Sequence, residues 1–238
     1  MNHLMIFKKL SAAMAATACL SLLGAIAPAQ AALITSPISL SSPKVIDFGQ
    51  FGGQFQFTSG PVQIGGLVGE DVTWSTNGPD SVIGNGGYGL GDNGSWSSGR
   101  DGYTGSNSSV RNMLFTFNDG LKSAVGGFIN YLPNNGSAVL IEALGEGGAL
   151  LESYDLFATA PISTPGQLDA GAFRGIQRAA NDIRALRVSN SFVVLDDLTF
   201  TTNSTPIPTP ALLPGLIAMS VGVLRKRKAE AAKGDAEA

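Results

Sequence analysis

The residues best suited to chemistry are aromatic rings and carboxylates in the stretch from Gly84 to Gly105, which holds nine glycines in 22 residues. The rings are Tyr88, Trp96 and Tyr103, and the carboxylates are Asp92 and Asp101. Aromatic faces stack on flat ligands such as sugar rings, and carboxylate oxygens bind calcium. This composition predicts a long surface loop without packed elements, whose rings either bind a carbohydrate or fold back onto the body of the protein. The second interpretation is favoured.

A second candidate is the carboxylate pair Asp196-Asp197, near the end of a strand expected from Phe192 to Phe200. Alternation along a strand points one carboxylate inward and the other outward. A buried carboxylate requires a partner, because an unpaired buried charge is costly. The available arginines are Arg174, Arg184 and Arg187. A salt-bridged strand end is therefore favoured over a ligand site.

Paired carboxylates are also the machinery of glycosidases. The candidates are Asp92, Asp101, Glu142 and Glu152. Their spacing singles out no pair, so we expect no catalytic residues and no enzyme.

The absence of two residue types excludes much other chemistry. His3 and Cys19 are the only histidine and cysteine, and both lie near the N-terminus. The rest of the chain therefore has no disulfide, no zinc site built from histidine or cysteine, and no Ser-His-Asp or Cys-His site. Residues 32–203 carry eight Lys and Arg against fifteen Asp and Glu, a formal charge of −7, which excludes nucleic acid as an expected partner.

Short strands must position these side chains. Of the 31 glycines, 27 lie within residues 32–203, and charged helix formers are few there, which predicts a turn-rich β protein after a leader at 33–43. The early strands are expected at Val45–Phe48, Pro61–Val68 and Val72–Trp74. Four later ones, joined by turns, predict an antiparallel meander: Val110–Phe117, Ala124–Leu132, Ala138–Leu144 and Ala149–Phe157. A meander is not stable alone in water, so a second sheet must cover its apolar face.

Residues 173–188 fit two patterns. The apolar positions Phe173, Ile176, Ala180, Ile183 and Leu186 follow a helical face, and periodicity alone favours that helix. The same segment also fits two strands joined at 179–182.

Six short pieces carry a resemblance to a known fold: Gly127-Phe128, Ala138–Ala143, Leu150–Ser153, Phe173–Ile176, Ile183–Val188 and Val194–Phe200. Together they resemble the strand series of galactose-binding-like jelly-roll domains of surface-sorted bacterial proteins. The resemblance implies an all-β, antiparallel, two-sheet jelly-roll sandwich, and it favours strands for residues 173–188. Because related jelly rolls hold calcium near strand ends, it also implies Asp47 or Asp197 as calcium ligands.

The N-terminus has the features of a secretory signal peptide. Lys8-Lys9 precede an apolar run from Leu10 to Ala27, and Ala29-Gln30-Ala31 offers small residues to a signal peptidase. Cleavage is expected after Ala31. A lipoprotein modified at Cys19 is the less favoured alternative, because Ala16 stands where leucine is usual and the apolar run continues past it.

The C-terminus combines a proline motif, an apolar run from Leu212 to Leu224, and a cluster of cations. The motif is Pro208, Thr209, Pro210 and Ala211, and the cations are Arg225, Lys226, Arg227 and Lys228. The fourteen residues from Ala211 to Leu224 predict a short membrane helix, with the basic residues and the tail on the cytoplasmic side. The order of parts resembles the PTPA variant of the PEP-CTERM sorting signal. That resemblance implies recognition by an exosortase-like membrane peptidase and delivery to the cell surface or its polysaccharide matrix.

The expected organisation is therefore a signal peptide (1–31), a β-sandwich domain (32–203), a linker with the sorting motif (204–210), a transmembrane helix with its basic stop (211–228) and a cytoplasmic tail (229–238). Three functions remain open. The favoured one is a non-catalytic surface module that binds carbohydrate or extracellular polysaccharide. The others are a structural coat or adhesion protein, and an enzyme that acts on polysaccharide.

Overall fold

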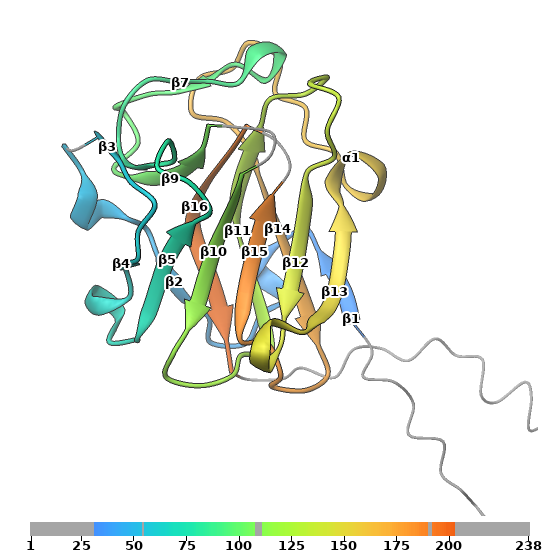
Figure 1. Ribbon diagram of the computed structural model, residues 1–238. Helices are drawn as coiled ribbons and strands as arrows, with labels where there is room; N and C mark the ends of the chain where they lie inside the picture. The colour runs from blue at the N-terminus through green and yellow to red at the C-terminus, as the bar shows by residue number, and fades with distance from the viewer. Residues whose placement is uncertain (1–30, 54, 108–110, 190–191, 203–238) are drawn as a thin grey trace, which may run out of the picture.

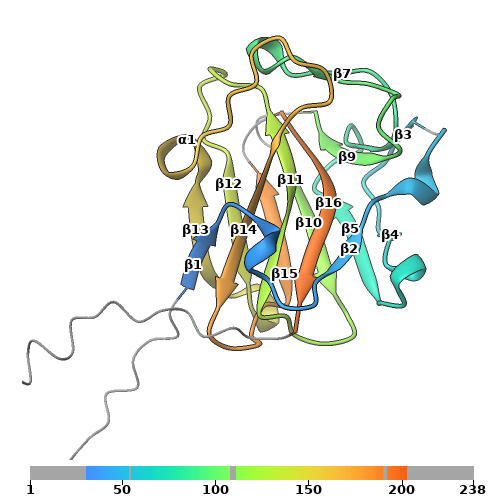
Figure 2. The same ribbon diagram turned by 180° about the vertical axis from the view of Figure 1, so that it is seen from behind.

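Buried and half-buried side chains alternate along the central strands. In β10 (Asn112–Phe117) the side chains of Met113, Phe115 and Phe117 are fully buried, whereas the residues between them are half-buried. Such a pattern requires a second layer over the apolar face. The computed structural model describes residues 31–53, 55–107, 111–189 and 192–202, and in this part of the chain two antiparallel sheets pack face to face as a β-sandwich (Figures 1 and 2).

The larger sheet has eight strands. Its order is β1 (Ala31–Ile34), β14 (Ala172–Arg178), β11 (Ala124–Tyr131), β16 (Val193–Thr201), β9 (Tyr103–Ser106), β6 (Val82–Gly84) and β3 (Phe55–Phe57), with β2 (Lys44–Ile46) also pairing with β16. The smaller sheet has six strands, in the order β13 (Leu150–Asp155), β12 (Leu140–Leu144), β15 (Ala185–Ser189), β10, β5 (Val72–Thr76) and β4 (Val62–Gln63). A two-stranded ribbon of β7 (Tyr88–Gly89) and β8 (Ser95–Trp96) lies outside both sheets.

The main core lies between the two sheets. Trp74 of β5 is paired with Phe115 of β10, and both side chains are fully buried. From the larger sheet, Ile176, Leu195 and Phe200 join the same apolar cluster. The sandwich is therefore held together mainly by burial of apolar surface between the layers.

Two strand predictions have different outcomes. Residues 173–188 form β14 and β15 rather than a helix, as the jelly-roll resemblance implied. The predicted meander is wrong. β10 belongs to the smaller sheet and β11 to the larger one, and only β12 and β13 form the expected hairpin. The turns after Phe117 and Tyr131 carry the chain from one sheet to the other. Turn residues in the sequence do not show whether the next strand pairs with the previous one or enters the opposite sheet.

The predictions for two irregular segments also change. The stretch 84–105 contains β7, β8 and most of β9, so the expectation that it forms no packed element is wrong. The leader predicted at 33–43 begins inside β1, which pairs with β14 and extends the larger sheet.

The two ends of the described sandwich domain lie close to one pole. β1 begins and β16 ends at the lower end in Figure 1, which we call the terminal end. The opposite pole, the loop end, is formed by segment 84–102, segment 160–171 and the connections that follow β11 and β13. The one α-helix among the described residues, α1 (Leu156–Thr159), follows β13 there.

Candidate functional site

The three aromatic rings predicted to bind a ligand are buried. The exposed fraction is 6% for Tyr88 and 0% for Trp96 and Tyr103, and the rings form a second apolar cluster with Val82, Leu90 and Val194. Burial raises the pKa of Tyr103 to about 12 and raises that of Tyr88 as well. The prediction that these rings stack a sugar at the surface is therefore corrected: they fold back onto the larger sheet, as the alternative interpretation expected.

Polar contacts tie the two loop-end segments to each other. The indole nitrogen of Trp96 donates to the carbonyl of Ala170 at 2.7 Å. The carboxylate of Asp169 accepts the Ser97 amide at 2.6 Å and the Ser97 hydroxyl at 2.9 Å. Segment 84–102 is therefore fixed on segment 160–171.

Asn93 adds a buried link that the sequence did not reveal. Its side-chain nitrogen donates to the carbonyls of Tyr131 at 3.0 Å and Ile162 at 3.1 Å, and its side-chain oxygen accepts the Thr164 amide at 3.1 Å. The sequence signal at this position, Asn93 followed by Gly94, indicates only a turn.

Arg100 is the central cation of the loop end. Its guanidinium carbon lies 4.3 Å from the centre of the Trp96 ring and 4.7 Å from that of Phe128. Two of its nitrogens donate to Asp196 Oδ2 at 2.9 and 2.6 Å, and a third donates to the Asp169 carbonyl at 2.8 Å. We call Trp96, Arg100, Phe128, Asp169 and Asp196 the Arg100 cluster.

Asp196 and Asp197 lie where β16 changes its partner. On one edge, residues Val193–Leu195 pair with β9, whereas Leu198–Phe200 pair with β2. On the other edge the register with β11 shifts between Gly126 and Phe128, and Asp197 adopts φ 49°. This bulge turns consecutive carboxylates to different neighbours.

The more buried carboxylate is Asp196, which has a cation partner, as the salt-bridge interpretation expected. That partner is Arg100, and the pair lies beside the second apolar cluster rather than in the core between the sheets. Burial raises the pKa of Asp196 to about 6, although the guanidinium of Arg100 acts in the opposite direction. The three arginines predicted as partners lie elsewhere. Arg174 donates to the carbonyls of Ala160, Phe173 and Pro161, Arg184 pairs with Glu146, and Arg187 pairs with Glu142.

Asp47 and Asp197, the predicted calcium ligands, lie next to each other. Asp47 follows Ile46, which pairs with Leu198. Burial raises the pKa of Asp197, and the negative charge of Asp47 raises it as well, whereas the positive charge of Arg100 lowers it. Calcium takes six to eight oxygen ligands. Among the residues that the structure describes, no group of three acidic, histidine or cysteine side chains could hold a metal ion, so these two carboxylates supply only part of a calcium site.

Two of the carboxylates considered for a glycosidase have arginine partners. Glu142 accepts two hydrogen bonds from Arg187, at 2.6 and 3.0 Å. Glu152 lies 3.6 Å from Arg178, whereas Asp92 and Asp101 are exposed. The contacts therefore assign both glutamates to structural ion pairs.

A shallow depression of about 290 Å³ opens at the loop end, beside α1. It is lined by Asn134, Gly136, Ser137, Ala138, Asp155 and Phe157. The ring of Phe157 is half-buried and packs edge-on against Tyr131 at 4.9 Å, and Asp155 caps α1 by accepting the Phe157 amide at 2.9 Å. An aromatic ring beside a carboxylate, an amide and a hydroxyl is a lining suited to a polyhydroxylated ligand.

Most residues of the predicted sorting and processing signals lie outside the described residues. These are Ala29, the proline motif at 208–211 and the cations at 225–228. Ala31 is described and is the first residue of β1. Within the described ranges, no helix has the length and apolar character needed to cross a membrane, and the helix predicted at 211–228 is beyond them.

Comparison with known proteins does not place the chain in a family. No protein-family model matches it, and no curated protein is similar to it.

Proposed function

We propose that the protein is an exported, non-catalytic surface module whose galactose-binding-like jelly-roll sandwich binds polysaccharide. The observation that carries this proposal is the depression at the loop end, lined by Phe157, Asp155, Asn134 and Ser137. Its volume of about 290 Å³ is close to the lower limit of roughly 300 Å³ for small-molecule pockets, so it suits one or two sugar units of a chain that continues across the open surface.

The position of the termini supports a role at the cell surface. If the segment after residue 202 is held in the membrane by the PEP-CTERM-type signal, the terminal end faces the membrane and the loop end with its depression faces outward (Figure 1). A polysaccharide would then reach the depression without passing between the sandwich and the lipid.

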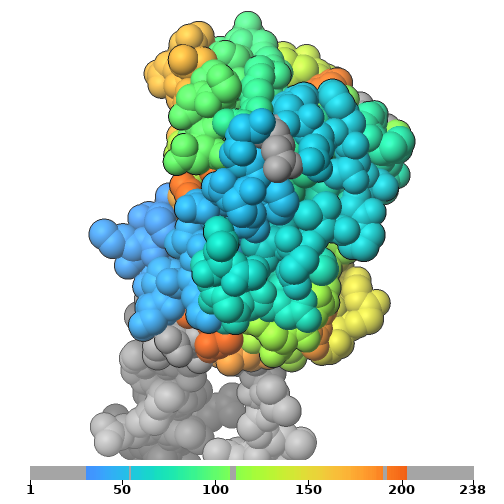
Figure 3. Space-filling model, turned by 90° about the vertical axis from the view of Figure 1, so that its left-hand side faces the viewer, coloured from blue at the N-terminus to red at the C-terminus, as the bar shows by residue number. Residues whose placement is uncertain are grey.

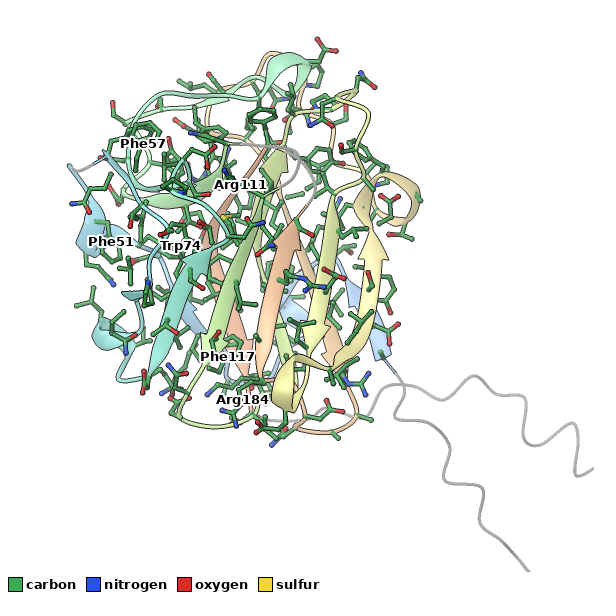
Figure 4. The ribbon with its side chains drawn as sticks, in the orientation of Figure 1. Phe51, Phe57, Trp74, Arg111, Phe117 and Arg184 are labelled. Carbon is green, nitrogen blue, oxygen red and sulfur yellow. The ribbon has the colours of Figure 1, made fainter. Side chains whose placement is uncertain are left out.

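The charges of the terminal end fit the same arrangement. Lys122 is 3% exposed and pairs with Glu70 at 2.8 Å and Asp119 at 3.0 Å. Its Nζ lies 5.6 Å from the centre of the ring of Phe117, a residue at the lower end of the molecule in Figure 4. Arg184 at this end also has a carboxylate partner, Glu146. Both cations therefore have carboxylate partners within the sandwich, so neither is left to bind the lipid surface that this end would face.

Polysaccharide binding is tested with the detergent-extracted full chain on a glycan array. Phe157→Ala is expected to reduce the affinity for the bound glycan at least about tenfold, which corresponds to ~1.4 kcal/mol, because the stacking surface is lost. Ser137→Ala should give a smaller decrease. Leu168→Ala is the matched control, because Leu168 is 64% exposed at the loop end and does not line the depression. Unchanged binding by Phe157→Ala, with the fold intact by circular dichroism, would refute the site.

Export and sorting are tested by mass spectrometry of protein extracted from the cell surface. We expect an N-terminus at Ala32, since cleavage after Ala31 leaves Ala32–Ile34 of β1 paired with β14. We also expect a C-terminus shortened near residues 208–211, and retention of the full C-terminus when residues 208–228 are replaced by an unrelated membrane helix. A chain with both termini intact and confined to the cytosol would be inconsistent with the proposal.

A further inference from the structure

The edge strand β3 lacks the features that keep sheet edges from pairing. It is the last strand of the larger sheet, and all three of its residues, Phe55, Gln56 and Phe57, are exposed. Exposed edges are usually guarded by charge, proline or a covering element. The described residues of segment 53–60 include no charge and no proline.

The other edge strands of the sandwich are guarded. β2, which pairs only with β16, follows Pro43 and carries Lys44. β4 follows directly after Pro61, and Gln63 donates to Asp71 at 2.7 Å. β13 carries Glu152 and Asp155. On β1, the side chains are half-buried and that of Ile34 is buried, whereas all three residues of β3 are exposed. The open edge of β3 is therefore the exception among the described edges.

The main-chain direction of β3 follows from its pairing with β6. The Thr58 amide donates to the Ser81 carbonyl at 2.9 Å, and Gln56 is the partner of Ile83. Since main-chain groups alternate along an antiparallel strand, the N–H and C=O groups of Gln56 and Thr58 point towards β6. Those of Phe55 and Phe57 consequently point away from the sheet.

The side chains of the same two residues form an exposed apolar platform. Phe55 is 38% exposed and Phe57 is 61% exposed, and their rings meet at right angles with centres 5.3 Å apart. The Phe55 ring packs directly on Gly86, where an added Cβ would lie 2.5 Å from the ring. Phe55 is therefore held against the rest of the domain. The segments around β3 form the face of the molecule shown in Figure 3, and Phe57 lies at its margin in Figure 4.

We propose that β3 pairs antiparallel with β3 of a second copy of this chain, about a two-fold axis that passes by Gln56. This arrangement places Phe55 opposite Phe57 of the second copy, so the outward main-chain groups of both residues gain partners. All four rings then lie on one face of a continuous sheet. A second copy fits better than an unrelated strand because the edge is self-complementary and uncharged, although the domain as a whole has a formal charge of −7.

The contact is short, so it is a weak one. A three-residue strand buries less than the roughly 1,000 Å² expected of a stable interface. It therefore acts where many copies are crowded side by side, as on a cell surface. This inference does not depend on polysaccharide binding, and it would give the protein a role in forming a coat.

The test is disulfide cross-linking of the full chain in membranes, in a Cys19→Ser background that has no native cysteine. Gln56→Cys places two thiols at a non-hydrogen-bonded pair beside the axis, where Cβ atoms of facing residues are close enough for a disulfide. Mild oxidation is expected to give a covalent dimer on a non-reducing gel. Gln63→Cys, on the guarded edge strand β4, is the control and should remain monomeric.

Charge substitutions then test the register. Adding Phe55→Lys and Phe57→Lys to Gln56→Cys should abolish the dimer, because lysines face lysines across the axis. Adding Phe55→Glu and Phe57→Lys should restore it, because each glutamate then faces a lysine. Absence of a dimer with Gln56→Cys would overturn the proposal, and so would equal cross-linking of Gln56→Cys and Gln63→Cys or of the two charge variants. Circular dichroism establishes that each variant is folded.

Discussion

Replacement of Trp96 by alanine is expected to lower the free energy of unfolding by about 3–5 kcal/mol, the usual range for truncating a buried aromatic residue. The indole is fully buried. It stacks on Phe128 with ring centres 6.0 Å apart, meets Tyr103 edge-on at 5.3 Å, and lies beneath the guanidinium of Arg100. Its loss therefore opens a cavity in the second apolar cluster and removes one face of the Arg100 cluster.

The measurement is denaturant unfolding followed by circular dichroism, with Trp96→Phe as the matched control. Phenylalanine keeps a ring in the cluster and removes the indole N–H. The Ala170 carbonyl is still satisfied, because the side-chain nitrogen of Asn130 donates to it at 2.7 Å. Trp96→Phe should therefore cost less than half as much as Trp96→Ala. A loss below about 1 kcal/mol for Trp96→Ala would mean that the ring contributes little to packing, against the range expected for a core aromatic.

The burial of Trp96 shows why composition alone predicts the wrong structure for the glycine-rich segment. Its glycines indicate flexibility when only composition is considered. In the structure, several are required by close packing: a Cβ at Gly94 would lie 1.8 Å from the Gln167 carbonyl oxygen, and one at Gly105 would lie 2.8 Å from the Tyr88 ring. The same residue type serves mobile loops and tight contacts, and only the three-dimensional partners separate the two cases.

Strand identity was easier to predict than strand pairing. The alternation of β10 and the apolar runs of β12 and β16 follow directly from residue type, since side chains point to opposite faces in turn. Pairing depends on which layer the chain enters after each turn. The link between Lys122 and Ile183, which closes the turn after Phe117, joins residues far apart in sequence and leaves no local signal.

The candidate site shows the same limit. Alternation predicts that one carboxylate of the pair Asp196-Asp197 points inward, and the cost of a buried charge predicts a cation beside it. The sequence offers Arg174, Arg184 and Arg187 as its partners. The actual partner, Arg100, comes from the segment between β8 and β9 and is brought there by packing of Trp96 and Phe128.

The ion pair between Arg100 and Asp196 supports the second large expected effect. Replacement of Arg100 by methionine should lower the free energy of unfolding at neutral pH by about 3–5 kcal/mol, the usual cost of removing one partner of a buried pair. The side chains are 15% and 9% exposed, so water compensates little of the lost interaction. The variant leaves a buried carboxylate without its cation and frees the Asp169 carbonyl.

The size of this loss should depend on pH. Burial raises the pKa of Asp196 from 3.8 to about 6, so between these values the folded protein binds a proton that the unfolded chain does not. The stabilisation from this group is fully present below pH 3.8 and disappears as the pH rises through about 6. Without Arg100 the pKa rises further. At pH 5 the carboxyl is then neutral in the variant, and the unpaired charge no longer contributes to the loss.

Urea unfolding of the wild type and Arg100→Met at pH 7 and pH 5 measures this difference. Two comparisons separate charge from packing. Arg100→Met combined with Asp196→Leu should recover most of the stability at pH 7, because an apolar pair of similar volume replaces a buried ion pair with little loss. Arg111→Met is the control, since its pair with Asp80 is more exposed and should contribute at most about 1 kcal/mol. An equal loss at both pH values for Arg100→Met would assign the effect to the contacts of the guanidinium with Trp96 and Phe128 rather than to the unpaired carboxylate.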